Sequence, residues 1–154
     1  CVHIAKNNQH IQCLSFDLPP VAPIASNNFN AMGLNERVKA VTGDFFKDDL
    51  PKADLITMCN VLHDWSEEDK KMLIQKAYKA LPEKGTLVVV ENIIDNNRSE
   101  NAFGLMMSLN MLIETDEGFD YSLSDFESWA NEAGFKNISI MPLTGPASAI
   151  IATK

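Results

Sequence analysis

The sequence predicts an α/β domain built on an open, mostly parallel sheet with one antiparallel strand at its carboxyl end. Short apolar runs alternate with segments of helical periodicity along most of the chain. Two of these runs, residues 54–62 and 86–90, are almost continuously apolar, as strands buried on both faces of a parallel sheet are. The last two runs, residues 138–143 and 149–153, flank Gly145-Pro146, which is typical of an antiparallel hairpin turn.

In the first third of the chain, helices and strands are predicted to alternate. They are the end of a helix over residues 2–6, a strand over 11–16, a helix over 20–32 and a strand over 38–42. Pro19-Pro20 closes the first strand after Asp17, because proline cannot donate to a strand ladder. Gly33 is placed to end the helix, and residues 45–53 are predicted to form a loop.

The rest of the chain continues the alternation up to the final hairpin. The predicted elements are a strand over 54–62, a helix over 67–81, a strand over 86–90, and helices over 103–113 and 122–133. Ser66 is the expected N-cap of the first of these helices, since three acidic residues follow it and complement the positive helix end. Pro82 and Gly85 are expected to end that helix.

Composition limits the classes of partner and the compartment. The chain has 154 residues, which fits one domain, and a formal net charge of −8, which argues against binding to nucleic acid or to anionic membranes. No apolar run approaches the length of a membrane span. The three cysteines form no CxxC pair and no disulfide framework, so a reducing cytoplasm is the expected location.

Polar side chains follow each predicted parallel strand where it ends. They are Asp17, Asp44, His63 and Glu91. The carboxyl ends of parallel strands share one edge of a sheet, where open α/β domains bind their ligands, so these side chains can converge. A single acid there is commonly a turn former or helix cap, and a lone histidine commonly caps a strand. Together the four favour a nucleotide-cofactor domain, because a carboxylate can accept from both ribose hydroxyls and histidine can act as a base.

Three segments then carry a resemblance to a known family. They are Phe16-Asp17-Leu18-Pro19, Gly43-Asp44-Phe45-Phe46, and Leu62-His63-Asp64-Trp65-Ser66 with Val90-Glu91-Asn92. The chain resembles, over essentially its whole length, the S-adenosylmethionine-dependent O-methyltransferases of the caffeate, hydroxyindole and bacterial polyketide type. The resemblance implies a Rossmann-like class I methyltransferase fold, a small-molecule hydroxyl acceptor and S-adenosyl-L-methionine as cofactor, with no metal.

The resemblance also implies roles for individual residues. His63 would be the general base, flanked by Glu91 and by Asp120, which falls in Gly118-Phe119-Asp120-Tyr121-Ser122 where the family usually has glutamate. The residues expected at the cofactor are Asp17 and Leu18 at the ribose and adenine, Asp44 and Phe45 at the adenine, and Cys59, Asn60 and Trp65 at the methionine end. The residues expected at the acceptor are Asp64, Met107 and Met111. For Met111, plain core packing is an equally open interpretation.

The chain also departs from the family pattern. The glycine-rich loop that cradles the methionine end of the cofactor, and the first, central strand of the sheet, would precede Cys1. The N-terminal dimerisation domain of the family is likewise expected to precede Cys1. We therefore expect residues 1–154 to be the carboxyl-terminal catalytic portion of a longer, homodimeric protein, and expect this portion alone to be inactive.

The resemblance implies transfer of a methyl group to a hydroxyl, expected to be phenolic, while His63 accepts the hydroxyl proton. Two alternatives stay open at this point. Asp17 would suit the ribose of a nicotinamide cofactor equally well, so an NAD(P)-dependent dehydrogenase domain is one of them. The other is a non-catalytic scaffold that kept the fold, which the missing glycine loop would favour and the presence of His63 and Glu91 disfavours.

Overall fold

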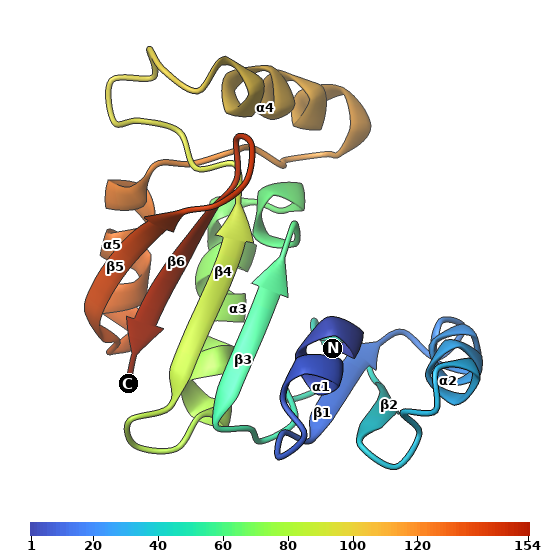
Figure 1. The fold of residues 1–154 in the computed structure, drawn as a ribbon. Helices are drawn as coiled ribbons and strands as arrows, with labels where there is room; N and C mark the ends of the chain where they lie inside the picture. The colour runs from blue at the N-terminus through green and yellow to red at the C-terminus, as the bar shows by residue number, and fades with distance from the viewer. The chain divides into compact units, whose positions relative to one another are not determined.

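The computed structural model describes all residues 1–154, which form two compact units, Cys1–Pro51 and Lys52–Lys154 (Figure 1). The helices and strands of the first unit are α1 (Val2–Asn7), β1 (Cys13–Asp17), α2 (Ala22–Ala31) and β2 (Val38–Thr42). The strands β1 and β2 are parallel and pair in register from Cys13 opposite Val38 to Asp17 opposite Thr42. The predicted parallel pairing in this part of the chain is therefore confirmed.

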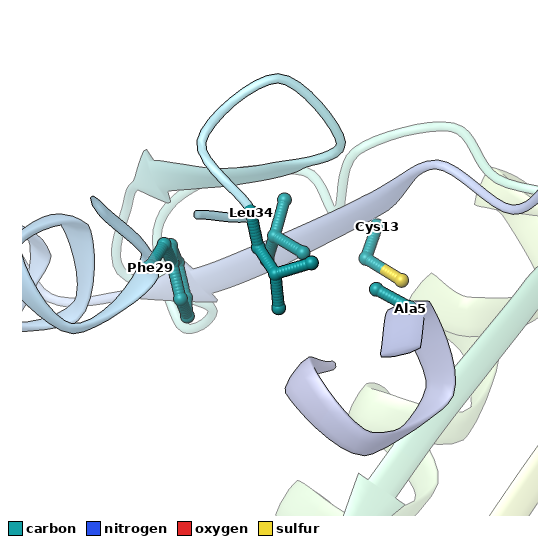
Figure 2. Packing of buried hydrophobic residues seen from close by; sticks show 5 residues of the cluster. Ala5, Cys13, Phe29 and Leu34 are labelled. Atoms are coloured by element: carbon teal, nitrogen blue, oxygen red, sulfur yellow. The ribbon is translucent and has the colours of Figure 1, made fainter. Parts of the chain in front are cut away.

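A small apolar core holds the first unit together. Its buried members are Ala5, Cys13, Phe29, Leu34 and Val38. Figure 2 shows Ala5 of α1 close to Cys13 of β1, with Leu34 and Phe29 further along the same layer. The guanidinium of Arg37 donates to the carbonyls of Ala5 at 2.7 Å and Asn8 at 3.2 Å, and so satisfies carbonyl groups at the end of α1.

The second unit contains the larger sheet. Its elements are β3 (Leu55–Cys59), the 3₁₀ turn η1 (Leu62–Asp64), α3 (Glu67–Ala80), β4 (Thr86–Glu91), α4 (Ala102–Glu114), α5 (Leu123–Ala133), β5 (Lys136–Pro142) and β6 (Ser148–Thr153). The strand order is β3-β4-β6-β5. β3 and β4 are parallel, whereas β6 is antiparallel to both of its neighbours. The α/β class and the antiparallel carboxyl-terminal strand are confirmed.

The helices of the second unit begin and end within one residue of the predicted positions. Ser66 Oγ accepts from Asp69 N at 3.1 Å at the start of α3. Ser122 and Asp125 form a reciprocal capping box at the start of α5, and Gly134 ends that helix with a positive φ of 107°. α3 and α5 pack against each other, and Trp129 Nε1 donates to Glu67 Oε1 at 3.3 Å between them. Figure 1 shows α4 beyond the carboxyl end of β4.

The prediction of a strand over residues 54–62 is wrong at its carboxyl end, and so is the placement of His63 directly at the end of a strand. β3 ends at Cys59, and His63 lies in η1. Asn60 has a positive φ of 50°, and its N–H makes the last ladder bond, to Val90 O at 3.0 Å. The next two N–H groups, of Val61 and Leu62, donate to the Glu91 carboxylate, so the ladder cannot continue.

The prediction that β3 is buried on both faces is also wrong. β3 is an edge strand of the four-stranded sheet, and Leu55 is 50% exposed. Only Met58 of this strand is buried. The apolar sequence of β3 therefore did not predict its place in the sheet. In the structure β3 pairs with one strand, β4, and not with two. The missing first strand stays a prediction, and none of the helices combines the length and apolar composition that crossing a bilayer requires.

Candidate active site

A buried histidine between two buried carboxylates forms the centre of the candidate site. His63 Nδ1 lies 3.2 Å from Glu91 Oε2 and 3.6 Å from Asp120 Oδ1. All three residues are buried, Glu91 and Asp120 almost completely. His63 Nδ1, Glu91 Oε2 and Asp120 Oδ2 have no aligned hydrogen bond, so the contacts become ion pairs only when the imidazole is protonated. The three residues that the resemblance assigns to catalysis are thus brought together by η1, β4 and the segment before α5.

The electrostatics of this cluster favour a protonated imidazole. The Asp120 carboxylate contributes most to raising the pKa of His63 above its ordinary value, and Glu91 and Asp64 raise it further, while burial opposes them. Burial raises the pKa of Glu91, against the lowering effect of His63 and of the Val61 and Leu62 N–H groups. His63 is therefore a stronger base than a free imidazole.

Glu91 has a second contact that the sequence pattern does not show. Its Oε1 accepts from Val61 N at 3.1 Å and from Leu62 N at 2.9 Å, while its Oε2 faces the imidazole. One carboxylate thus holds the backbone of the turn that carries His63 and also contacts the ring. Since both N–H groups would otherwise be unpaired in a buried turn, Glu91 helps to form the fold as well as the site.

Asp64 lies on the other side of the imidazole. Its Oδ1 is 3.3 Å from His63 Nε2, and its side chain is 40% exposed, in contrast to the buried groups at Nδ1. Nε2 is consequently the ring nitrogen nearer to the surface. Nδ1 thus has two buried carboxylates beside it, and Nε2 has one that is partly exposed.

Asp120 is positioned by contacts with α4 and η1. Its N–H donates to Ser108 Oγ of α4 at 3.1 Å. Gly118 passes so close to η1 that an added Cβ would lie 2.7 Å from His63 O, which explains the glycine at this point of the segment. Gly118 N also donates to Thr115 Oγ1 at 2.8 Å, and this hydrogen bond stabilises the turn after α4.

The ligand atoms of His63, Glu91 and Asp120 lie within 4.8 Å of one another, a spacing that a metal ion could also use. A fourth charged group bears on this question. Lys70 of α3 is fully buried, and the carboxylates of Glu91 and Asp120 attract its ammonium. A resident ammonium supplies positive charge to the same carboxylates, which weakens the case for a cation there.

Lys70 is the functional candidate that the sequence reasoning missed, although a signal was present. The buried residues of α3 are Lys70, Leu73, Ile74, Ala77 and Ala80. Their spacing is that of one helix face, so a lysine stands at the start of the apolar face. A charged residue at such a position, four residues after the N-cap Ser66, points to a buried partner of opposite charge.

The predicted cofactor residues of the first unit lie at the carboxyl ends of its two strands. Asp17 ends β1 and is exposed, and its carboxylate accepts only from Leu18 N, at 2.8 Å to Oδ1. Asp44 follows β2 and pairs with Lys47 at 2.8 Å, while Phe46 N donates to it at 3.0 Å. Phe45 meets Phe46 edge to face at 4.9 Å. Asp17 and Leu18 are open to a ligand, whereas Asp44 already has two partners.

The other predicted residues fall in the second unit. Cys59 is exposed at the end of β3, Asn60 is exposed in the following turn, and Trp65 is partly buried after η1. In α4, Met107 is partly buried and Met111 is buried, one turn apart on one helix face. α4 contacts η1, which places the helix that carries both methionines beside the turn that carries His63.

Comparison with known proteins identifies the family. An O-methyltransferase domain family matches residues 2–136. The tetracenomycin polyketide synthesis 8-O-methyl transferase TcmO of Streptomyces glaucescens is 31% identical over 152 residues, which are 99% of this chain and 45% of that protein. The acetylserotonin O-methyltransferase of Bos taurus is 35% identical over 93% of this chain and 41% of its own length.

A solved structure agrees with these matches. The O-methyltransferase NcsB1 from neocarzinostatin biosynthesis, in complex with S-adenosylmethionine and 2-hydroxy-5-methyl naphthoic acid, superposes with a TM-score of 0.86 at 25% identity, covering 99% of this chain and 44% of that one. The chain thus spans less than half the length of these relatives. The comparisons favour the methyltransferase interpretation and give no support to the dehydrogenase alternative. The chain belongs to the O-methyltransferase domain family.

Proposed function

We propose that the full-length protein transfers a methyl group from S-adenosyl-L-methionine to a phenolic hydroxyl of a small molecule, with His63 as general base. The observation that carries this proposal is the buried His63–Glu91–Asp120 cluster, in which two buried carboxylates contact Nδ1, while Nε2 lies beside the partly exposed Asp64 carboxylate. The aromatic hydroxy acid bound in NcsB1 supports the phenolic class of acceptor.

The residues of the first unit fit the proposed cofactor. Asp17 offers an exposed carboxylate with its Oδ2 uncommitted, the kind of group that accepts from ribose hydroxyls. Asp44 could accept from an amino group only in competition with Lys47. S-adenosylmethionine, when bound, supplies an electrophilic methyl group.

The chain's own residues supply the proton chemistry. An acceptor hydroxyl on the Nε2 side of His63 gives its proton to that nitrogen, and Glu91 and Asp120 stabilise the imidazolium that forms. Between a phenol with a pKa of about 10 and a free imidazole of about 6.5, full proton transfer costs about 5 kcal/mol. The carboxylates that raise the pKa of His63 reduce this cost.

A pH–rate profile tests the proposal. We expect kcat for methyl transfer to a phenolic acceptor to fall with decreasing pH, with a midpoint above 6.5. The sign follows from the site, since only neutral His63 can accept a proton and the carboxylates raise the pKa at which it becomes neutral. Turnover that stays constant as the pH falls well below 6.5 would contradict His63 as the base, and a protein without any methyl transfer would support a scaffold.

Cofactor binding gives a second test in the full-length protein. We expect Asp17→Ala to weaken S-adenosylmethionine binding by roughly 10- to 100-fold, which corresponds to about 1.5–3 kcal/mol for hydrogen bonds to a charged group. Asp44→Ala should weaken it less, because Lys47 already occupies that carboxylate. Titration calorimetry measures both dissociation constants, and tight NAD binding without S-adenosylmethionine binding would contradict the cofactor assignment. The acceptor residues Asp64, Met107 and Met111, the homodimer and the cytoplasmic location stay predictions.

A further inference from the structure

The buried Lys70 has contacts on both sides of the candidate site. Its Nζ donates to the carbonyl of Trp65, directly after η1. The same Nζ lies 3.5 Å from the centroid of the Phe119 ring and 5.8 Å from that of Tyr121. Phe119 and Tyr121 are the two neighbours of Asp120 in the chain, so Lys70 contacts the segments on either side of the base and of its carboxylate.

The charges around Lys70 explain why a lysine is buried at this position. Two of the acidic groups near Lys70 are buried and come from other elements, Glu91 from β4 and Asp120 from the segment before α5. The other two, Asp64 of η1 and Glu67 of α3, are more exposed. All four attract the ammonium. Burial has the larger effect and lowers the pKa of Lys70 to about 8, which still leaves the side chain mostly protonated at neutral pH.

Other uses of Lys70 fit the structure less well. A nucleophilic or acid–base lysine must reach the substrate, but Lys70 is 0% exposed and its Nζ is held against a carbonyl and a ring. The attraction of its ammonium by two buried carboxylates also sets Lys70 apart from a lysine that serves packing alone. Lys70 and His63 are instead influenced by the same two buried carboxylates, those of Glu91 and Asp120.

We propose that Lys70 is a positioning residue for the reaction. Its buried ammonium offsets part of the negative charge of Glu91 and Asp120, so these carboxylates stabilise the imidazolium of His63 less. A larger fraction of His63 is then neutral and able to act as a base. This inference rests on the function proposed above. Without the ammonium, the two carboxylates would be balanced only by the imidazolium, and His63 would hold its proton more tightly. Lys70 thus counteracts the effect of the carboxylates on the imidazole.

Lys70→Met in the full-length protein tests the proposal, because methionine nearly keeps the length of the side chain and removes its charge. We expect the pKa of His63 to rise by about one unit, a tenfold change in the ratio of neutral to charged imidazole at a given pH. Accordingly, kcat should fall about tenfold near and below neutral pH and approach the wild-type value at alkaline pH. NMR titration of the His63 imidazole, assigned by its absence in His63→Gln, measures the pKa without reference to activity.

Lys71→Met is the matched control. Lys71 is the next residue of α3, is 38% exposed, and pairs at the surface with Glu67 at 2.8 Å and Glu132 at 3.8 Å. This variant should leave the His63 pKa and the pH profile unchanged. Lys70→Gln, a second neutral variant that keeps a hydrogen-bond donor, replaces Lys70→Met if the latter does not fold, and Lys70→Arg should restore most of the wild-type profile because it keeps the charge.

Two results would overturn the role of Lys70. One is an unchanged His63 pKa in the neutral variants, and the other is a loss of kcat that is equal at all pH values, as loosened packing alone would give. Absence of methyl transfer in the wild-type protein would count against the proposed function instead. The NMR titration of His63 would in that case still decide whether Lys70 lowers its pKa.

Discussion

His63→Gln is expected to lower kcat for methyl transfer by about 10²- to 10⁴-fold, the range for loss of a general base, with little change in S-adenosylmethionine affinity. Glutamine is polar and of similar size, so the buried position beside Glu91 and Asp120 can stay filled. Its amide cannot accept a proton at the pH of the reaction, so a hydroxyl on the former Nε2 side would have to lose its proton to water. The acidic limb of the pH–rate profile should disappear in the same variant, because the group that produces it is gone.

The chain offers a matched control for this substitution. His10 is an exposed histidine of the first unit, and His10→Gln makes the same chemical change at a residue outside the carboxylate cluster. Steady-state kinetics of both variants across pH, with calorimetric titration of the cofactor, measure the two effects separately. Near-normal turnover in His63→Gln would leave His63 as a structural residue of η1, and the base would have to be sought elsewhere.

The sequence predicted the elements of the fold well because their end signals are local. The cap at Ser66, the stop at Gly134 and the hairpin turn at Gly145 each depend on a few neighbouring residues, and all three are present in the structure. The carboxyl end of β3 was not predictable in this way. It depends on Glu91, which is 29 to 30 residues away from the N–H groups that it takes out of the ladder.

The same distinction separates the predicted and missed parts of the site. Glu91 ends β4 and His63 lies shortly after the adjacent parallel strand β3, so their approach could be expected from topology. Asp120 follows no strand, and only the resemblance pointed to it. Its place beside His63 depends on the close approach of Gly118 to η1 and on Ser108 of α4, contacts between residues distant in sequence. Lys70 was detectable only as a charge on the apolar face of α3.

Glu91 has two roles in the structure, and a conservative substitution can separate them. Its Oε1 accepts from the Val61 and Leu62 N–H groups, and its Oε2 contacts His63 Nδ1. In Glu91→Gln, the amide oxygen is needed at the Oε1 position, because an NH₂ group there would face two N–H donors. The amide NH₂ must then point to Nδ1.

Glu91→Gln is therefore expected to place the histidine proton on the wrong nitrogen. An NH₂ group donating to Nδ1 favours the tautomer with hydrogen on Nε2, and that tautomer cannot accept a proton from the acceptor hydroxyl. We expect kcat to fall by about 10²- to 10³-fold, less than in His63→Gln, since Asp120 still stabilises the imidazolium. Thermal stability should change little, whereas Glu91→Ala should lose about 1–3 kcal/mol because it leaves buried N–H groups unpaired.

The double variant decides whether Glu91 acts through His63. If it does, Glu91→Gln combined with His63→Gln should have nearly the same kcat as His63→Gln alone, because the tautomer of a missing imidazole has no effect. Independent roles would instead multiply the two losses, and that result would contradict the coupling. The NMR shifts of the imidazole nitrogens in Glu91→Gln provide the direct check, since hydrogen remaining on Nδ1 would show that Glu91 does not set the tautomer of His63.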